Sequence, residues 1–317
     1  RTNFRHTAVF ARAHGNLYRG ARRALRGRTA TFTGARGGLC AAAREREEKD
    51  GHMIKLVASD LDGTLLDPAG NLPGGAFRAI GKLHDKGILF CAASGRQLVA
   101  LQQMFAPVAD KVLFLAENGA LVAYGQRVLH SRAIPAEDTL RALDAIGTLG
   151  GVHALLCTPK CAYYADEAQP FLYFVKASYV SNQKADLRKT AVRERVCKIA
   201  VYDDDGPEKK TMTVLPHALP DMRVTLSGGN WLDISGRNTH KGRAMRFIQK
   251  AFRFAREECI AFGDHMNDYE MLIECGHPYV PENAYPPLKK LIGRTIPSNA
   301  EGGVVTALEL LAEGKLP

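Results

Sequence analysis

The chain has 317 residues, 46% of them hydrophobic, and a formal net charge of +10. This length allows two ordinary domains or one large one. No segment approaches the roughly eighteen consecutive apolar residues of a membrane span, so we expect no membrane partner.

The basic character is concentrated in a leader, residues 1–52. Residues 1–50 contain twelve Lys and Arg against four Asp and Glu, so the leader carries about +8 of the charge and the remaining body is close to neutral. We favour a translated upstream or vector region, with Met53 as the natural start, over an organelle transit peptide or a nucleic-acid-binding arm. Such a composition is expected to be disordered, and nucleic acid is the least favoured partner.

The first predicted strand, residues 54–58, leads to two closely spaced carboxylates. Asp60 and Asp62 are followed by Gly63 and Thr64. Side chains two residues apart in a strand point to the same side, so both acids are expected to face one cavity. Carboxylates this close resist joint ionisation unless a cation lies between them. The pair therefore predicts a metal site, a nucleophile beside an acid/base, or both.

Two simpler interpretations apply to the same segment. Asp-Gly is a common dipeptide in solvated turns. A calcium-binding EF-hand requires glycine at loop position 6 and glutamate at position 12, and a loop that starts at Asp60 has Leu65 and Asn71 there. The calcium interpretation fails, whereas the turn interpretation stays open for this segment taken alone.

Two further apolar runs end in polar residues suited to binding phosphate. Residues 88–93 lead to Ser94 and Arg96, and residues 259–262 lead to the segment 263–268, Gly-Asp-His-Met-Asn-Asp. A helical pattern begins near Lys241. In an open parallel α/β sheet, ligands bind beyond the carboxyl ends of the strands, so we expect these side chains to converge.

The middle of the chain, residues 133–235, carries no such motif, yet it is patterned like a folded domain. The sequence predicts a helix at 136–149, a strand pair at 153–157 and 161–164, a strand at 196–202, and a further strand pair at 222–226 and 231–234. These elements make an α/β insert of about one hundred residues, a plausible size for a domain.

Taken together, four segments resemble the four motifs of the haloacid dehalogenase-like phosphohydrolases: residues 60–64, Ser94, Lys241 and residues 263–268. Residues 117–120 (Glu-Asn-Gly-Ala) and the order of elements further resemble the Cof-type branch. The resemblance runs from residue 53 to the C-terminus. It implies an α/β fold with a Rossmann-like parallel-sheet core, residues 53–132 plus 236–317, and an inserted α/β cap domain of the C2B type, residues 133–235.

The resemblance also implies roles for individual residues. Asp60 is the expected nucleophile and Asp62 the expected general acid/base. Mg²⁺, which prefers oxygen ligands, is expected to be held by Asp60, Asp264 and the backbone carbonyl of Asp62. The other expected site residues are Ser94, Lys241 and Asn267 for phosphate binding, Asp268 and Gly63 for support behind the site, and Arg96, Asn118 and Gly119 for weaker substrate contacts.

These expectations predict a Mg²⁺-dependent phosphatase that hydrolyses a small phosphorylated metabolite, a sugar phosphate or related phosphoester, through an aspartyl-phosphate intermediate. A phosphomannomutase-like phosphotransferase is the main alternative, because the nucleophile motif serves both reactions. The seven cysteines show no disulfide framework, and a reduced cytoplasm is the expected setting. The sequence does not predict the oligomeric state.

Overall fold

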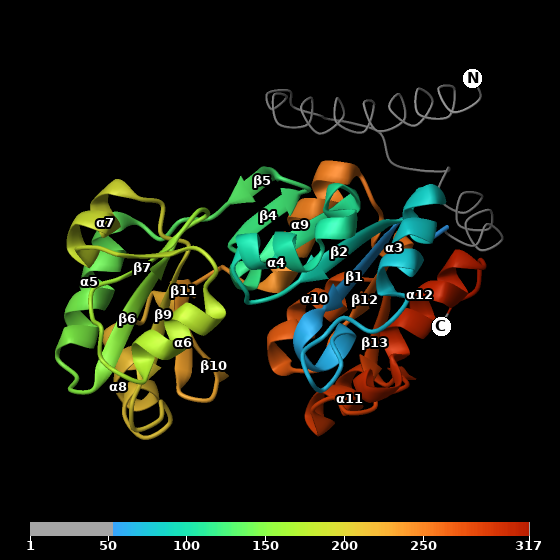
Figure 1. The fold of residues 1–317 in the computed structure, drawn as a ribbon. Coiled ribbons are helices and arrows are strands. Elements are labelled where there is room, and N and C mark those ends of the chain that lie inside the picture. Colours follow the sequence, from blue (N-terminus) through green and yellow to red (C-terminus); the bar gives the residue numbers. More distant parts are fainter. Residues whose placement is uncertain (1–52, 317) are drawn as a thin grey trace, which may run out of the picture.

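Two β-sheets organise the chain (Figure 1). The structure is a computed structural model that describes residues 53–316, so the predictions for the leader, residues 1–52, lie outside the described residues. Within the described range, none of the helices combines the length and the apolar character of a membrane span.

The first sheet has eight strands in the order β14-β13-β12-β1-β2-β3-β4-β5. The pairs from β14 to β3 are parallel, and β4 and β5 join antiparallel at one edge. The predicted α/β fold with a parallel-sheet core is confirmed. The strands are β1 (Leu56–Asp60), β2 (Leu89–Ala93), β3 (Val112–Ala116), β4 (Leu121–Tyr124), β5 (Arg127–Ser131), β12 (Cys259–Phe262), β13 (His277–Pro281) and β14 (Thr295–Ile296).

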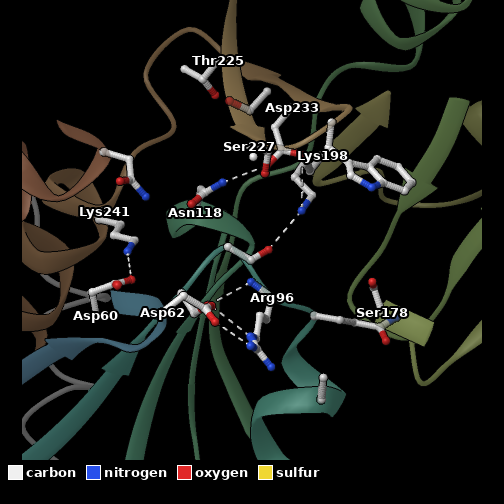
Figure 2. A pocket seen from close by; sticks show the side chains of 18 of the residues that line it. Asp60, Asp62, Arg96, Asn118, Ser178, Lys198, Thr225, Ser227, Asp233 and Lys241 are labelled. Carbon is white, nitrogen blue, oxygen red and sulfur yellow. Dashed lines mark hydrogen bonds and ion pairs between the residues drawn. The ribbon is translucent and has the colours of Figure 1, made fainter. Parts of the chain in front are cut away.

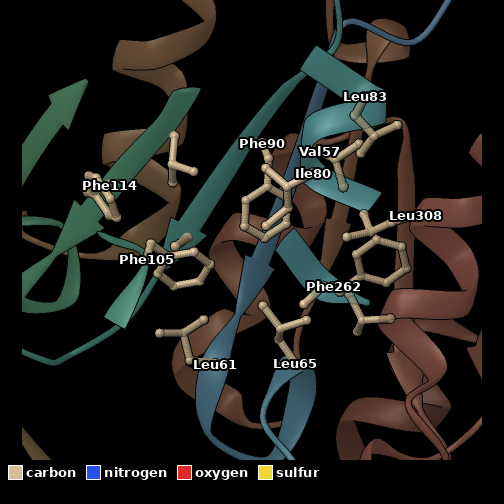
Figure 3. Close-up of a cluster of buried hydrophobic side chains, with 14 of the residues drawn as sticks. Val57, Leu61, Leu65, Ile80, Leu83, Phe90, Phe105, Phe114, Phe262 and Leu308 are labelled. Atoms are coloured by element: carbon tan, nitrogen blue, oxygen red, sulfur yellow. The ribbon is translucent and has the colours of Figure 1, made fainter. Parts of the chain in front are cut away.

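Helices cover both faces of this sheet. Because side chains alternate along a strand, Val57 of β1 packs with Ile80 and Leu308 on one face (Figure 3), whereas Leu56 packs with Met245 on the other. Fully burying one such large side chain stabilises the fold by about 1.5–3 kcal/mol. This packing fixes the positions of the strand ends. The helices are α3 (Ala76–Asp85), α4 (Leu98–Met104) and α12 (Gly303–Ala312) on the first face, and α9 (Lys241–Phe252), α10 (Tyr269–Glu274) and α11 (Pro286–Ile292) on the second.

The second sheet is built by the segment that leaves the first sheet after β5 and returns before α9. Its order is β10-β11-β9-β6-β7-β8. Both predicted strand pairs are confirmed as antiparallel neighbours, β6 with β7 and β10 with β11. The elements are α5 (Ala136–Gly147), β6 (Val152–Cys157), β7 (Ala162–Tyr164), α6 (Phe171–Ser178), β8 (Asn182–Lys184), α7 (Leu187–Arg193), β9 (Lys198–Asp203), α8 (Thr211–Ala218), β10 (Met222–Gly228) and β11 (Trp231–Gly236).

The start of the chain's first strand differs slightly from the prediction. The sequence predicts a strand at 54–58, but β1 covers Leu56–Asp60 and therefore includes Asp60 as its last residue. The backbone then enters a helical turn, η1 (Leu61–Leu65), which contains Gly63 at φ 81°. This turn determines where Asp62 lies.

Candidate active site

A cavity of about 990 Å³ lies where the carboxyl ends of β1, β2 and β12 meet the second sheet (Figure 2). Its lining from the first sheet includes Asp60, Ser94 and Asp264, and its lining from the second sheet includes Lys198 and Asp233. A crevice outside the carboxyl ends of parallel strands is where this sheet architecture binds ligands. The cavity is therefore the candidate active site.

Three carboxylates converge at one end of the cavity. Asp60, Asp264 and Asp268 each offer an oxygen atom, and these oxygens lie within 4.8 Å of one another. The convergence of Asp60 and Asp264 is the spatial arrangement that the sequence predicts.

Asp268 differs from the other two acids because protein groups already occupy its oxygens. One oxygen accepts a hydrogen bond from Lys241 at 2.6 Å, and the other accepts from the backbone N–H groups of Asp264 and His265, both at 3.1 Å. Asp268 is therefore suited to orienting Lys241 and the loop after β12. Asp264 is held by Thr64, whose hydroxyl donates to its carboxylate at 2.8 Å.

Lys241 supplies the positive charge of the cluster. It is the first residue of α9, is 1% exposed, and forms ion pairs with both Asp60 and Asp268. Burial lowers the pKa of Lys241, but the adjacent Asp268 and Asp60 carboxylates outweigh that effect and raise the pKa above its ordinary value. The ammonium is thus charged at every physiological pH.

The cluster carries more negative charge than Lys241 can balance. Burial raises the pKa of Asp60 well above its ordinary value, Asp268 raises it further, and Lys241 only partly opposes this. Burial and the charge of Asp268 likewise raise the pKa of Asp264. A divalent cation would restore the balance, and carboxylate oxygens are the ligands that Mg²⁺ prefers. The residues present therefore fit Mg²⁺, with Asp60 and Asp264 as the side chains that could hold it.

Gly63 permits the close approach of η1 to Asp264. Its φ of 81° is in the left-handed region that favours glycine. A Cβ atom at this position would overlap the Asp264 carboxylate. The structure thus gives a steric reason for the glycine of the Asp-Leu-Asp-Gly-Thr segment.

We expect Gly63→Ala to displace Asp264 and to lower kcat by about 100-fold, the size of loss that an ångström-scale misplacement can cause. The Mg²⁺ concentration for half-maximal activity should rise. Gly70→Ala is the matched control, because Gly70 has the same φ of 81° but no atom within 4 Å of its missing Cβ. Equal losses in the two variants would assign the effect to backbone strain and contradict the steric explanation.

Asp62 also lines the cavity, but not for the predicted reason. The strand alternation that would align it with Asp60 ends at Asp60, and the turn η1 determines its position instead. Its carboxylate accepts two hydrogen bonds from Arg96, one from Nε at 3.0 Å and one from Nη2 at 2.5 Å. Arg96, predicted as a weak substrate contact, therefore holds Asp62 in this structure.

Residues 94–97, which we call the 94–97 loop, follow β2 and line the cavity. Ser94 is 2% exposed, and its hydroxyl accepts a hydrogen bond from the backbone N–H of Arg96 at 3.2 Å. Asn267, predicted as a phosphate contact, also lines the cavity. Asn118 lines it too, and its amide donates to Asp233 of the second sheet at 2.9 Å.

Gly119 was predicted as a weak substrate contact. It is not among the residues that line the cavity. A Cβ atom at Gly119 would lie 2.5 Å from the carbonyl oxygen of His240, so the glycine lets the start of α9 pack against the turn after β3. Its φ of 98° gives a second reason for glycine at this position.

The part of the cavity that comes from the second sheet was not predicted from the sequence. Lys198 and Asp233 are both buried and lie within strands, β9 and β11, that are otherwise apolar around them. A charged residue inside an apolar strand requires a partner. This requirement is the sequence signal from which Lys198 and Asp233 could have been found. Glu117, fully buried after β3, is the partner of Lys198 at 2.8 Å.

Comparisons with known proteins agree with this geometry. The family model described as haloacid dehalogenase-like hydrolase matches residues 57–308. The chain is similar to the 5-amino-6-(5-phospho-D-ribitylamino)uracil phosphatase YbjI of Escherichia coli K12, with 26% identity over 272 residues, 83% of this chain and 98% of that protein. It is also similar to the HMP-PP phosphatase of Cronobacter sakazakii, with 26% identity over 241 residues, 74% of this chain and 87% of that protein. Among solved structures, TM0651 from Thermotoga maritima superposes with a TM-score of 0.72 at 26% identity, covering 81% of this chain and 97% of that one.

Proposed function

Because the chain belongs to the haloacid dehalogenase-like hydrolases, we propose that its cavity hydrolyses phosphate monoesters of small metabolites with Mg²⁺ as cofactor. The observation that carries this proposal is the meeting of Asp60, Asp264 and Lys241 at one end of the cavity. Two carboxylates for a divalent ion and one ammonium for a phosphate oxygen are the charges that phosphoryl transfer requires.

In the proposed first step, a carboxylate oxygen of Asp60 attacks the phosphorus atom and forms an aspartyl-phosphate, while the bond from phosphorus to the ester oxygen breaks. Asp62 donates a proton to that departing oxygen, which leaves as an alcohol. Asp62 then removes a proton from a water molecule that attacks the phosphorus and regenerates Asp60. Such proton transfers contribute about 10²- to 10⁴-fold in rate, and splitting one difficult step into two is the advantage of a covalent nucleophile.

The other residues bind and orient the phosphate. When bound, Mg²⁺ supplies the positive charge that lets the Asp60 carboxylate approach a phosphate dianion. Asp264 and the backbone carbonyl of Asp62 complete the protein ligands that we assign to it. We assign the phosphate oxygens to the Ser94 hydroxyl, the Asn267 amide and the Lys241 ammonium, in the last case beside the positive end of α9.

We further propose that residues 133–235 act as a cap that covers the cavity. A cap that closes over the site excludes water and large substrates, which favours a small phosphoester over a phosphoprotein. The Escherichia coli relative is named for a substrate with a phosphorylated ribityl chain, and a sugar phosphate or related phosphoester is the class we propose here. A reducing cytoplasm is the setting we propose, since the buried Cys91 and Cys197 are free thiols.

Release of inorganic phosphate from p-nitrophenyl phosphate and from a panel of sugar phosphates tests the proposed function. The full chain and a chain that begins at Met53 are both measured with and without Mg²⁺. We expect Mg²⁺-dependent release at equal rates from the two chains. An isomerised sugar phosphate without free phosphate would instead identify a phosphotransferase, and no turnover of any ester would refute the proposal.

Mg²⁺ is also expected to stabilise the fold. Binding at 100 times the dissociation constant adds about 2.7 kcal/mol, which corresponds to a rise of about 4–5 °C in Tm for a chain of this size. The pKa values of Asp60 and Asp264 are raised, so protons compete with the metal at low pH. The rise in Tm should therefore grow as the pH increases beyond the ordinary carboxyl range.

Differential scanning calorimetry with and without Mg²⁺, repeated at several pH values, measures this effect. In Asp264→Asn the rise in Tm should disappear. An unchanged rise in that variant would place the stabilising Mg²⁺ elsewhere in the protein.

A further inference from the structure

Lys198 has contacts that the proposed chemistry does not explain. It belongs to β9 of the second sheet and is 3% exposed. Its ammonium lies 2.8 Å from Glu117 Oε2, donates to the Gly95 carbonyl oxygen at 3.0 Å, and lies 3.6 Å from Asp233 Oδ1. Three acceptors surround a group with three N–H donors, so Lys198 is committed to protein partners, two of which belong to the other sheet.

The Gly95 carbonyl belongs to the 94–97 loop, and a second contact ties that loop to the insert. Gln97 is 1% exposed, its amide N–H donates to the Ser181 carbonyl at 2.9 Å, and its amide oxygen accepts from the Ser181 backbone N–H at 3.2 Å. One loop is therefore held from the insert at Gly95 and again at Gln97. Ser94, which we assign to the phosphate, and Arg96, which holds Asp62, lie in the same four residues.

The turn after β3 belongs to the same assembly. The backbone N–H of Asn118 donates to the Ser94 carbonyl, and that of Glu117 donates to the Arg96 carbonyl, both at 3.1 Å. Glu117 and Asn118 have φ values of 49° and 53°, in the left-handed region that residues other than glycine rarely occupy. Backbone strain of this kind persists where surrounding contacts impose it, often at functional sites.

The Lys198–Glu117 ion pair suits a contact that can form and break reversibly. Glu117 is fully buried, and the Lys198 ammonium, 2.8 Å from its Oε2, is its counter-charge. The cost of dehydrating two buried charges nearly offsets their attraction. The pair therefore adds little to the net stability of the interface, and its main effect is on geometry.

We propose that Lys198 is a positioning residue: through the Gly95 carbonyl it fixes the 94–97 loop, and through Arg96 the direction of Asp62, only while the insert covers the cavity. This inference rests on the proposed phosphatase function. Its consequence is that proton donation to the leaving oxygen becomes effective when the insert is seated on the site.

The test compares two esters that differ in their need for Asp62. The alkoxide that leaves ribose 5-phosphate needs a proton, whereas the phenolate that leaves p-nitrophenyl phosphate is far less basic and needs it little. With Mg²⁺ and the full chain, single turnovers measure the first step alone, because Asp62 serves as the base of the second step for both esters. In Lys198→Met the first step should slow about 100-fold for ribose 5-phosphate and much less for the aryl ester, because only the alkoxide needs the proton. A general loosening of the fold would lower both rates together.

Two further variants separate positioning from simpler effects. Lys198→Met leaves Glu117 as an unpaired buried charge, and Lys198→Met/Glu117→Gln removes that charge; the selective loss should persist in the double variant. Glu270→Gln breaks a different ion pair, Arg223 of β10 with Glu270 of α10 at 2.9 Å, without touching the 94–97 loop, and should show no selective loss. Where Lys198→Met does not fold, Gln97→Leu cuts the second contact of the loop and should give the same selectivity.

Equal losses on the two esters, recovery in the double variant, or the same selectivity in Glu270→Gln would each overturn the inference. Measurements on the wild-type enzyme distinguish a failure of the proposed function from a failure of this inference. If it hydrolyses no ester of the panel, the proposed function fails. If it hydrolyses the aryl ester but no sugar phosphate of the panel, the acid role of Asp62 fails and the inference fails with it.

Discussion

Replacing Asp60 by Asn is expected to reduce phosphate release by at least about 10⁴-fold, because an amide oxygen is a poor nucleophile and no other group takes over covalent catalysis. Asn has nearly the same shape as Asp, so the cavity should keep its form. Steady-state release of phosphate from p-nitrophenyl phosphate at saturating Mg²⁺ measures the loss. Rapid acid quenching of the wild-type enzyme should trap phosphate on Asp60, and the variant should trap none.

The stability of the variant separates a lost nucleophile from a damaged fold. Because the pKa of Asp60 is raised by burial, its charged form costs stability at pH values above the ordinary carboxyl range, and a neutral amide removes that cost. The Tm of metal-free Asp60→Asn should therefore equal or exceed that of the wild type. Asp110→Asn, at an exposed position in the helical turn η2 (Ala106–Lys111) before β3, is the matched control and should retain full activity. Undiminished turnover in Asp60→Asn would refute the assignment of the nucleophile.

The half of the site that belongs to the first sheet could be predicted because its information is local. Asp60, Ser94 and Asp264 each stand at or directly after the end of a buried apolar run, and parallel strands bring such ends to one edge of the sheet. The order and spacing of these segments were enough to anticipate that Asp60 and Asp264 meet. The strand pairs of the insert were equally local, because each is closed by a short turn.

The rest of the site depends on contacts that join distant segments. The pairing of Lys198 with Glu117 depends on how the second sheet faces the first, and no local pattern encodes that. Asp62 was assigned to the cavity by strand alternation, but the turn η1 determines its direction. Gly119 was predicted as a substrate contact, and the close packing of α9 against it, which also favours glycine, is a contact between distant segments.

Replacing Lys241 by Met should have the second large effect. The ammonium lies between Asp60 and Asp268, and we expect its loss to lower kcat by about 10³-fold, near the upper end of the effect of removing one preorganised donor to a developing anion. Without Mg²⁺ the variant should also be less stable by about 3–5 kcal/mol, since one partner of a buried ion pair has been removed. Lys250→Met, at an exposed position on the same helix, should change neither quantity.

A double variant distinguishes the catalytic charge from the structural one. Lys241→Met/Asp268→Asn removes one of the two carboxylates that the single variant leaves without a counter-charge, so calorimetry should show that much of the lost Tm returns. Phosphate release should remain low, because no ammonium is present to bind the phosphate oxygens and to balance Asp60. If activity returned together with stability, Lys241 would be acting only as a structural counter-ion to Asp268, and its role in binding phosphate would have to be withdrawn.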